Sequence, residues 1–238
     1  LHEEMSLNDK MVIYGQDIAD PKGGVFTATR GLSEKFGNNR VFNSPLAESS
    51  IVGTAIGMSV AGYKPVVEIQ FGDYIWTAMM QIRNELATMR YRSNNAWSCP
   101  IVIRVPVGGY IHGALCHSQS IDGYFMHLPG IYIAYPSCAV DAKGLLKMAC
   151  RMNDPVIFME HKGLYRQNYA ATQEPDEEYI LPFGKGRIVN EGDELTLITW
   201  GAMVQKSLDA IRSLALSDGL IEVIDLRTLN PVDLDLIE

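Results

Sequence analysis

The residues of this chain best suited to chemistry lie at positions 108–120, with the sequence GGYIHGALCHSQS. This stretch holds His112 and His117, two of the five histidines in the chain. It directly follows the apolar run at residues 101–105, which is typical of a buried strand. Rigid folds present reactive groups on loops at the ends of strands. We therefore expect an active-site loop here, with a hydrogen-bonded structural role as the alternative for His117.

A zinc site in the same loop is a weaker interpretation. His112, Cys116 and His117 are residue types that bind zinc. No second cluster in the sequence completes a set of four ligands. The pattern therefore favours proton transfer over zinc binding, and it leaves any metal ligands of the chain undefined.

Two further residues are suited to binding a heterocyclic ring. Glu48 opens a small-residue, apolar helical pattern, where apolar surroundings would favour sharing of a proton with a ring nitrogen. Tyr74 begins another helical pattern, and its flat ring could stack on a heterocycle. The alternatives are a carboxylate that interacts with the helix dipole for Glu48 and a core position for Tyr74.

Apolar runs alternate with helical patterns along the chain. The predicted strands are residues 11–14, 65–69, 101–105, 131–135, 156–159, 195–199 and 221–225, and the predicted helices are residues 2–8, 29–36, 49–62, 73–91, 139–152 and 202–215. Continuous apolar strands between helices indicate an α/β fold with a parallel sheet.

The chain is predicted to contain two domains. A polar segment at residues 161–178 has the composition of a linker. We therefore predict an α/β domain at residues 1–178, linker included, and the start of a second α/β domain at residues 179–238. The second part holds one right-handed βαβ unit, which cannot cover both faces of its sheet, so we expect this domain to be incomplete. The chain opens on Leu1 rather than Met, which leaves room for an upstream segment.

Composition argues against several classes of protein. A net charge of -8, from 20 basic and 28 acidic residues, does not suit a nucleic-acid surface. No window has the roughly 18 consecutive apolar residues that a membrane span needs. The glycine fingerprint of nicotinamide-linked oxidoreductases is missing. Four cysteines without a CxxC pair favour a reduced, cytoplasmic location.

A series of motifs, taken in order, resembles one family. They are PLAE at residues 45–48, the small-residue helix at 53–62, FGDYI at 71–75, YRS at 91–93, HGALCHSQS at 112–120, LPG at 128–130, DAKGLL at 141–146 and VIDLRT at 223–228. The chain resembles the beta subunit, or beta half, of the thiamine-diphosphate-dependent decarboxylating component of 2-oxo acid dehydrogenase complexes. The loop motif looks closest to the branched-chain (2-oxoisovalerate) type. The resemblance covers essentially the whole chain and implies a transketolase-like pyrimidine-binding domain followed by a truncated transketolase C-terminal-like domain.

The resemblance implies roles for four residues. Glu48 stands where the family places the carboxylate that contacts the aminopyrimidine ring of thiamine diphosphate, and Tyr74 matches the aromatic residue that stacks on this ring. His117 matches the active-site histidine that positions substrate and moves protons during acyl transfer. His112 matches the branched-chain pattern nearby and is expected to support the substrate side. The implied reaction decarboxylates a 2-oxo acid, here a branched-chain one, and transfers the acyl group to a lipoyl domain.

The resemblance also implies partners. The family binds the diphosphate through Mg²⁺ held by a Gly-Asp-Gly stretch with Asn-Asn downstream. Residues 72–74 (GDY) and 94–95 (NN) depart from this pattern, because Tyr74 replaces the last glycine. We therefore expect an alpha subunit, or an upstream alpha segment, to hold the magnesium and the diphosphate. A second beta copy, in an alpha2-beta2 or fused dimer, and a lipoyl-bearing acyltransferase are the other expected partners, in the cytoplasm or in the mitochondrial matrix of a eukaryote.

A structural potassium ion is a further implication. The family holds K⁺ on main-chain carbonyls of the beta chain, which correspond here to residues 100–103 and 149–154. Met152 stands where a polar residue is usual. Main-chain ligands leave little trace in side-chain identity, so the sequence alone does not decide this site.

Three other functions fit parts of the pattern. The first is a pyruvate dehydrogenase beta subunit. The second is an enzyme of the transketolase or deoxyxylulose-phosphate synthase type, which shares the pyrimidine-binding domain, although the spacing around His117 disfavours it. The third is a non-catalytic scaffold of the same fold, in which Glu48 and His117 are ordinary core groups.

Overall fold

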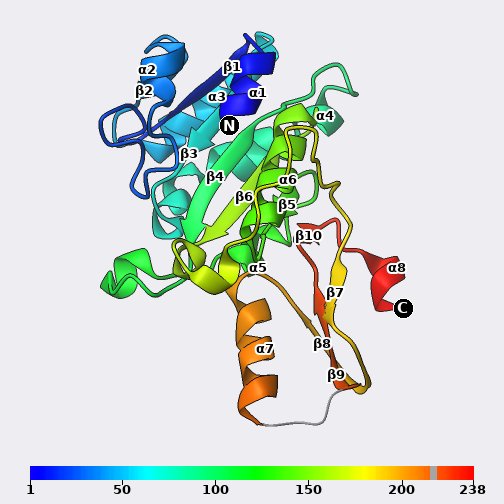
Figure 1. Cartoon of the computed structure of the whole chain (residues 1–238). Helices are drawn as coiled ribbons and strands as arrows, with labels where there is room; N and C mark the ends of the chain where they lie inside the picture. The colour runs from blue at the N-terminus through cyan, green and yellow to red at the C-terminus, as the bar shows by residue number, and fades with distance from the viewer. Residues whose placement is uncertain (215–218) are drawn as a thin grey trace.

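The computed structural model describes residues 1–214 and 219–238, and it arranges them around two sheets (Figure 1). The larger sheet has the strand order β10-β5-β6-β4-β3-β1-β2. Its strands are β1 (Met11–Gly15), β2 (Val41–Asn43), β3 (Lys64–Glu68), β4 (Val102–Val107), β5 (Tyr132–Ala134), β6 (Val156–His161) and β10 (Thr228–Asn230). Neighbouring strands are parallel except for β10, which pairs antiparallel with β5. The predicted α/β class is confirmed.

Both faces of this sheet are buried, which explains why its strands are mostly apolar. One core cluster joins the sheet to α3 and to residues 72–89, and the other joins it to α1 and α6. Successive residues of β1 alternate between them, with Val12 in the first cluster and Met11 and Ile13 in the second. The helices concerned are α1 (His2–Leu7), α3 (Glu48–Val60) and α6 (Ala139–Arg151).

The segment predicted as one helix over residues 73–91 is divided, so that prediction is wrong. It consists of a 3-10 helix η1 (Gly72–Ala78), a π-helix η2 (Met80–Leu86) and a short α-helix α4 (Met89–Arg92). Within the widened turn, the Ala87 N–H donates to the Ile82 carbonyl, five residues back, at 2.9 Å. The Thr88 hydroxyl donates to the Asn84 carbonyl at 2.5 Å and so competes for the acceptor of a regular α-helical bond.

The smaller sheet has the order β7-β9-β8. Its elements are β7 (Arg187–Asn190), β8 (Gly192–Thr199), α7 (Ala202–Ser213) and β9 (Gly219–Asp225). β8 and β9 are parallel and flank α7, as the βαβ prediction requires. β7 was not predicted, and the predicted helix end at residue 215 lies outside the described residues. The domain boundary after residue 178 stays a prediction.

Short elements complete the described chain. They are α2 (Leu32–Phe36), η3 (Ala114–His117), α5 (Asp122–Phe125), η4 (Lys162–Leu164), η5 (Asn168–Ala170) and α8 (Leu234–Ile237). Two of them, η4 and η5, lie in the segment predicted as a linker. In the described part of the chain, no helix combines the length and apolar character needed to cross a membrane.

The two sheets are joined by buried polar contacts as well as by β10. The Arg227 guanidinium donates two hydrogen bonds to the Asp141 carboxylate, each 3.0 Å long. Ser137 Oγ donates to Asp225, and both groups are buried. These contacts fix the segment after β9 against the residues that follow β5 in the larger sheet.

Candidate functional site

The candidate site lies at the carboxyl edge of the parallel sheet. Gln16 directly follows β1, Glu48 begins α3 after β2, Tyr74 follows β3, and the loop at residues 108–120 follows β4. Carboxyl ends of parallel strands meet at one edge, which is where α/β folds bind their ligands. The sheet therefore brings together segments that are far apart in the sequence.

Glu48 lies half-buried at the first turn of α3, between two hydrogen-bond donors. Gln16 Nε2 donates to Glu48 Oε1 at 2.9 Å, and Thr77 Oγ1 donates to Glu48 Oε2 at 3.2 Å. Each carboxylate oxygen thus has one protein partner and further lone pairs free. This arrangement fixes the orientation of the carboxylate while leaving it able to accept another hydrogen bond.

Gln16 was not identified from the sequence. Its side chain is 2% exposed, and its Oε1 atom has no hydrogen-bond partner among the described residues. A buried acceptor without a partner is costly, so it favours a ligand that brings an N–H donor. The signal available in the sequence was its position directly after a buried strand.

Tyr74 and Thr77 are placed together by the 3-10 helix η1. Residues three apart lie above one another in this type of helix. Thr77 Oγ1 lies 3.3 Å from the Tyr74 carbonyl and also reaches Glu48. The unexpected 3-10 geometry therefore connects the predicted carboxylate with the predicted aromatic residue.

His117 has a hydrogen-bond partner at each ring nitrogen. Its Nδ1 lies 2.9 Å from the Gly113 carbonyl, and its Nε2 lies 2.7 Å from the Tyr74 hydroxyl. A carbonyl can only accept, so the Nδ1 atom must carry the proton. Burial, with help from the nearby Asp73 and Glu48 carboxylates, raises the pKa of Tyr74, which therefore remains a phenol able to donate. In the neutral tautomer with its proton on Nδ1, the Nε2 atom accepts the hydrogen bond of the Tyr74 hydroxyl.

The backbone of the loop is shaped around His117. A Cβ atom at Gly113 would lie 2.4 Å from the Cβ atom of His117, so glycine is needed for this close approach. Tyr110, His112 and Ala114 have positive φ angles of 76°, 55° and 54°, a conformation that costs free energy for residues with side chains. Strain of this kind is common where a loop positions functional groups.

Three of the four predicted site residues come together, and the fourth does not. Glu48, Tyr74 and His117 are linked through Thr77 and hydrogen bonds of 2.7 to 3.3 Å. The His112 side chain is exposed on the loop, and within the described residues it has no hydrogen-bond partner. Their catalytic roles stay predictions.

A buried lysine beside this site was also not identified from the sequence. Lys162 is 4% exposed, and its Nζ atom has no hydrogen-bond partner in the part of the chain that the structure describes. The ammonium lies 5.4 Å from the centre of the Phe71 ring, and the edge of that ring packs on His117 with centroids 4.6 Å apart. Burial lowers the pKa of Lys162 to about 8, against a smaller opposing effect of Asp73.

Replacing Lys162 by Met is expected to stabilise the fold at pH 7. Its pKa falls from 10.5 in the unfolded chain to about 8 in the fold, which corresponds to a cost of about 3 kcal/mol for the buried charge. The cost is present below the folded pKa and disappears as the pH rises from about 8 towards 10.5, because the folded form then releases its proton first. Urea unfolding should therefore show a smaller increase in the free energy of unfolding of Lys162→Met over the unaltered protein at about pH 9.5 than at pH 7.

Lys185→Met is the matched control for this prediction. The Lys185 side chain is 58% exposed, so its replacement should change the free energy of unfolding by less than about 0.5 kcal/mol. A Lys162→Met variant that is no more stable than the unaltered protein at pH 7 would contradict the prediction.

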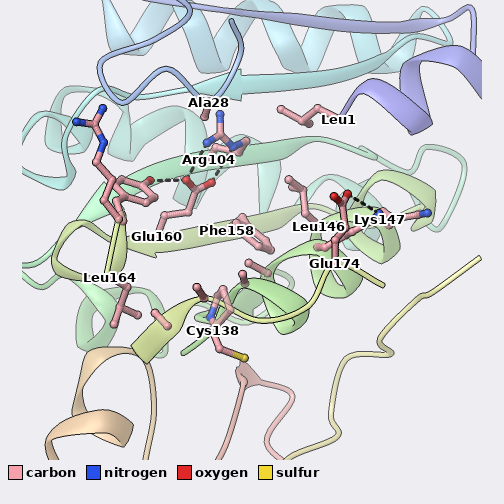
Figure 2. A pocket seen from close by; sticks show the side chains of 18 of the residues that line it. Leu1, Ala28, Arg104, Cys138, Leu146, Lys147, Phe158, Glu160, Leu164 and Glu174 are labelled. Carbon is pink, nitrogen blue, oxygen red and sulfur yellow. Dashed lines mark hydrogen bonds and ion pairs between the residues drawn. The ribbon is translucent and has the colours of Figure 1, made fainter. Parts of the chain in front are cut away.

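A cavity of about 1010 Å³ lies elsewhere on the sheet. Glu48, Tyr74 and His117 are not among the described residues that line it. Figure 2 shows Arg104 of β4 beside Glu160 of β6 at its wall, with Phe158 on the same strand. Arg104 Nε lies 2.7 Å from Glu160 Oε1 and Arg104 Nη1 lies 2.6 Å from Glu68 Oε2. The Arg104 guanidinium thus pairs with both carboxylates, which favours a structural role for the cavity wall.

The candidate site fits one edge of an aminopyrimidine ring better than it fits a metal ion. Glu48 offers a carboxylate, Gln16 an unpaired acceptor and Tyr74 an aromatic ring. Across residues 1–214 and 219–238, no group of three or more His, Cys, Asp or Glu side chains has the arrangement of a metal site.

Comparison with known proteins gives consistent similarities. The family model "Transketolase, pyrimidine binding domain" matches residues 1–168, and "Transketolase, C-terminal domain" matches residues 184–238. The 2-oxoisovalerate dehydrogenase subunit beta of Bacillus subtilis (strain 168) is 49% identical over 234 residues, covering 98% of this chain and 70% of the relative. The pyruvate dehydrogenase E1 component subunit beta of the same organism is 44% identical over 238 residues, covering 100% of this chain and 72% of the relative.

Among solved structures, a split-gene transketolase described as an inactive beta4 tetramer has a TM-score of 0.76. It is 23% identical, and the match covers 99% of this chain and 71% of that one. At this level of identity the likeness shows the fold alone.

Proposed function

The chain belongs to the beta subunits of the 2-oxo acid dehydrogenases, built on the transketolase pyrimidine-binding and C-terminal domains, and from this premise we propose that it forms one wall of an active site that decarboxylates a 2-oxo acid. The acyl group is then transferred to a lipoyl domain. Glu48, Tyr74 and His117 are the residues of this chain that act on the cofactor and the substrate, with His112 in support.

One observation carries this proposal. Gln16, Glu48, Thr77, Tyr74 and His117 form a continuous set of polar contacts at the carboxyl edge of the sheet. A scaffold protein has no need for an unpaired buried acceptor beside an oriented carboxylate, whereas a ring-binding site does. The arrangement therefore supports an enzyme rather than a non-catalytic fold.

Glu48 is the residue that would hold the aminopyrimidine ring, and Tyr74 would contact the face of this ring. When bound, thiamine diphosphate supplies the nucleophile and the electron sink that decarboxylation of a 2-oxo acid requires. The Glu48 carboxylate, oriented by Gln16 and Thr77, shares a proton with a ring nitrogen through one of its Oε atoms. Because two donors already fix its orientation, this proton transfer needs little reorganisation of the protein.

His117 is the proton carrier on the substrate side. The Gly113 carbonyl holds its Nδ1–H, so Nε2 is the atom at which the ring takes up and returns a proton. In the tautomer protonated at Nδ1, the Tyr74 hydroxyl donates to the same Nε2 atom at 2.7 Å. We infer that His117 moves protons at Nε2 while the acyl group passes to the lipoyl arm.

A partner chain completes the site. Leu46, two residues before Glu48, is 81% exposed, and Leu115 and Tyr110 of the loop are 77% and 59% exposed. Large apolar side chains around a polar site are typical of a surface that another chain covers. We propose that an alpha chain covers them and binds the magnesium and the diphosphate, that a second beta copy joins the assembly, and that a lipoyl-bearing acyltransferase receives the product.

The substrate we propose is a branched-chain 2-oxo acid such as 2-oxoisovalerate. The relative named for 2-oxoisovalerate has 49% identity, and the one named for pyruvate has 44%. A pocket distinguishes aliphatic groups by only about 1 to 3 kcal/mol per methylene. A few substitutions among the residues that line the acyl pocket can therefore change which 2-oxo acid is preferred. Turnover of the assembled enzyme with pyruvate, 2-oxoisovalerate and 2-oxoglutarate distinguishes the alternatives.

The location we propose is a reducing compartment, the bacterial cytoplasm. All four cysteines of the chain are free thiols. Unpaired cysteines are the ordinary state in reducing compartments. The two relatives named above are bacterial.

Titration with thiamine diphosphate and Mg²⁺ tests the proposed function. We expect tight binding only when the chain is mixed with a cognate alpha chain, because this chain provides the ring side of the site and not the diphosphate side. Tyr74→Ala should weaken binding to the mixture about tenfold, since base–aromatic contacts contribute roughly 1 to 3 kcal/mol, whereas Tyr74→Phe should retain it. Absence of binding with and without the alpha chain would support the scaffold alternative instead.

A further inference from the structure

The family resemblance implies a potassium ion bound to main-chain carbonyls of residues 149–154. In this structure a lysine side chain binds two of these carbonyls. Lys64, the first residue of β3, is 6% exposed. Its Nζ atom donates to the Ala149 carbonyl at 3.0 Å and to the Met152 carbonyl at 2.8 Å. These main-chain oxygens therefore have a cationic partner already, and the segment does not fit an additional potassium ion.

The position of these carbonyls explains why a cation is needed. Ala149 lies in the last turn of α6, and Met152 is its C-cap. The last carbonyls of a helix lack partners within the helix and carry the negative end of its dipole. An ammonium group and a potassium ion satisfy the same requirement, because both are compact monovalent cations that bind carbonyl oxygens.

Other polar groups of the segment are also occupied. Arg90 Nε lies 2.7 Å from Asp154 Oδ1, and the Arg90 guanidinium reaches the Asn153 carbonyl at 3.4 Å. In the other segment of the expected site, the Ile101 carbonyl accepts a hydrogen bond from the Val156 N–H at 2.8 Å. A potassium ion bound here would have to share its oxygen ligands with these donors.

The surroundings also disfavour entry of a metal cation. A hollow of about 620 Å³ lies beside the segment, and Lys64, Pro100 and Met152 are among its lining residues. A second cation on the carbonyls of Ala149 and Met152 would lie close to the positive Lys64 ammonium, which is 3.0 and 2.8 Å from these oxygens. Like charges at short range in a poorly solvated place repel strongly.

We propose that the ammonium group of Lys64 takes the place of the structural potassium ion at the C-terminal end of α6, so that the fold of this protein does not depend on potassium. The side chain connects the start of β3 to the end of α6, 85 residues further along the chain. It thereby performs within one chain the cross-linking that a bound ion would otherwise provide.

Thermal unfolding of the protein in different salts tests this proposal. At equal ionic strength, the Tm should be the same within about 1 °C in potassium, sodium and choline chloride. Stabilisation by several degrees in potassium chloride alone would overturn the proposal, because it would show a specific potassium site in the folded state.

Lys64→Met provides a second, independent test. It keeps an unbranched side chain, one atom shorter, and removes the cation, which leaves two carbonyls without their partner, so we expect the Tm to fall by roughly 3 to 10 °C in every salt. The matched control is Lys10→Met, which removes an exposed lysine next to the same strand pair and should leave the Tm unchanged. A Lys64→Met protein as stable as the Lys10→Met control would overturn the proposal. If Lys64→Met does not fold, the salt series on the unaltered protein still decides.

Discussion

Replacing Glu48 by Gln is expected to lower the rate of 2-oxo acid decarboxylation by about 10³-fold or more in the enzyme assembled with its alpha chain. Glutamine has nearly the same shape, so the helix start at α3 and its packing are preserved. The amide cannot take up the proton that the carboxylate shares with the ring, and its NH₂ group cannot accept the hydrogen bond that Gln16 or Thr77 donates. The loss therefore falls on kcat more than on the stability of the chain.

Single-turnover decarboxylation with saturating cofactor measures this effect. Glu34→Gln is the matched control, because Glu34 is an exposed glutamate in the first turn of another helix, α2. The control should keep the full rate. Full activity of the Glu48→Gln enzyme would refute the assignment of Glu48.

His117→Ala is expected to abolish acylation of a lipoyl domain, with a loss of about 10² to 10⁴-fold. The variant removes the Nε2 atom that takes up and returns a proton, and it releases Tyr74 from its hydrogen bond. Decarboxylation coupled to an artificial electron acceptor should fall less, because that assay bypasses the acyl transfer. The contrast between the two assays separates a role in transfer from a general loss of structure.

The measurement compares the rate of lipoyl acylation with the rate of decarboxylation coupled to the artificial electron acceptor, in the same preparation of His117→Ala. His127→Ala serves as the control, since His127 is exposed and lies outside the loop at residues 108–120. It should be neutral in both assays. An unchanged rate of lipoyl acylation in His117→Ala would count against the proton-carrying role of this residue.

Much of the fold was predictable because its signals are local. A strand buried on both faces, such as β4, is apolar at most of its positions, with the ion-paired Arg104 as the exception, and this run can be recognised without knowing its neighbours. The parallel sheet then places the loop after β4 at the carboxyl edge. The motifs around Glu48 and His117 gave the family, and the matched family models and relatives agree with it.

The errors have physical causes that the spacing of apolar residues does not reveal. The apolar spacing over residues 73–91 is that of a helix, but it does not reveal that the Thr88 hydroxyl takes the Asn84 carbonyl and widens the turn. β10 was missed because three residues are too few for a pattern, and it forms only through pairing with β5. In the structure this strand returns the chain to the first sheet.

The sequence by itself determined the class of fold, the family, and the residues that are candidates for chemistry, because composition and short-range spacing carry this information. Only the tertiary structure decided which groups touch: Gln16 and Glu48 are 32 residues apart, Tyr74 and His117 are 43 apart, and Lys64 is 85 from Ala149. These contacts depend on the order of the strands and on how closely backbones approach. Neither property is encoded in the periodicity of one segment, since both arise when the whole sheet is assembled and buried.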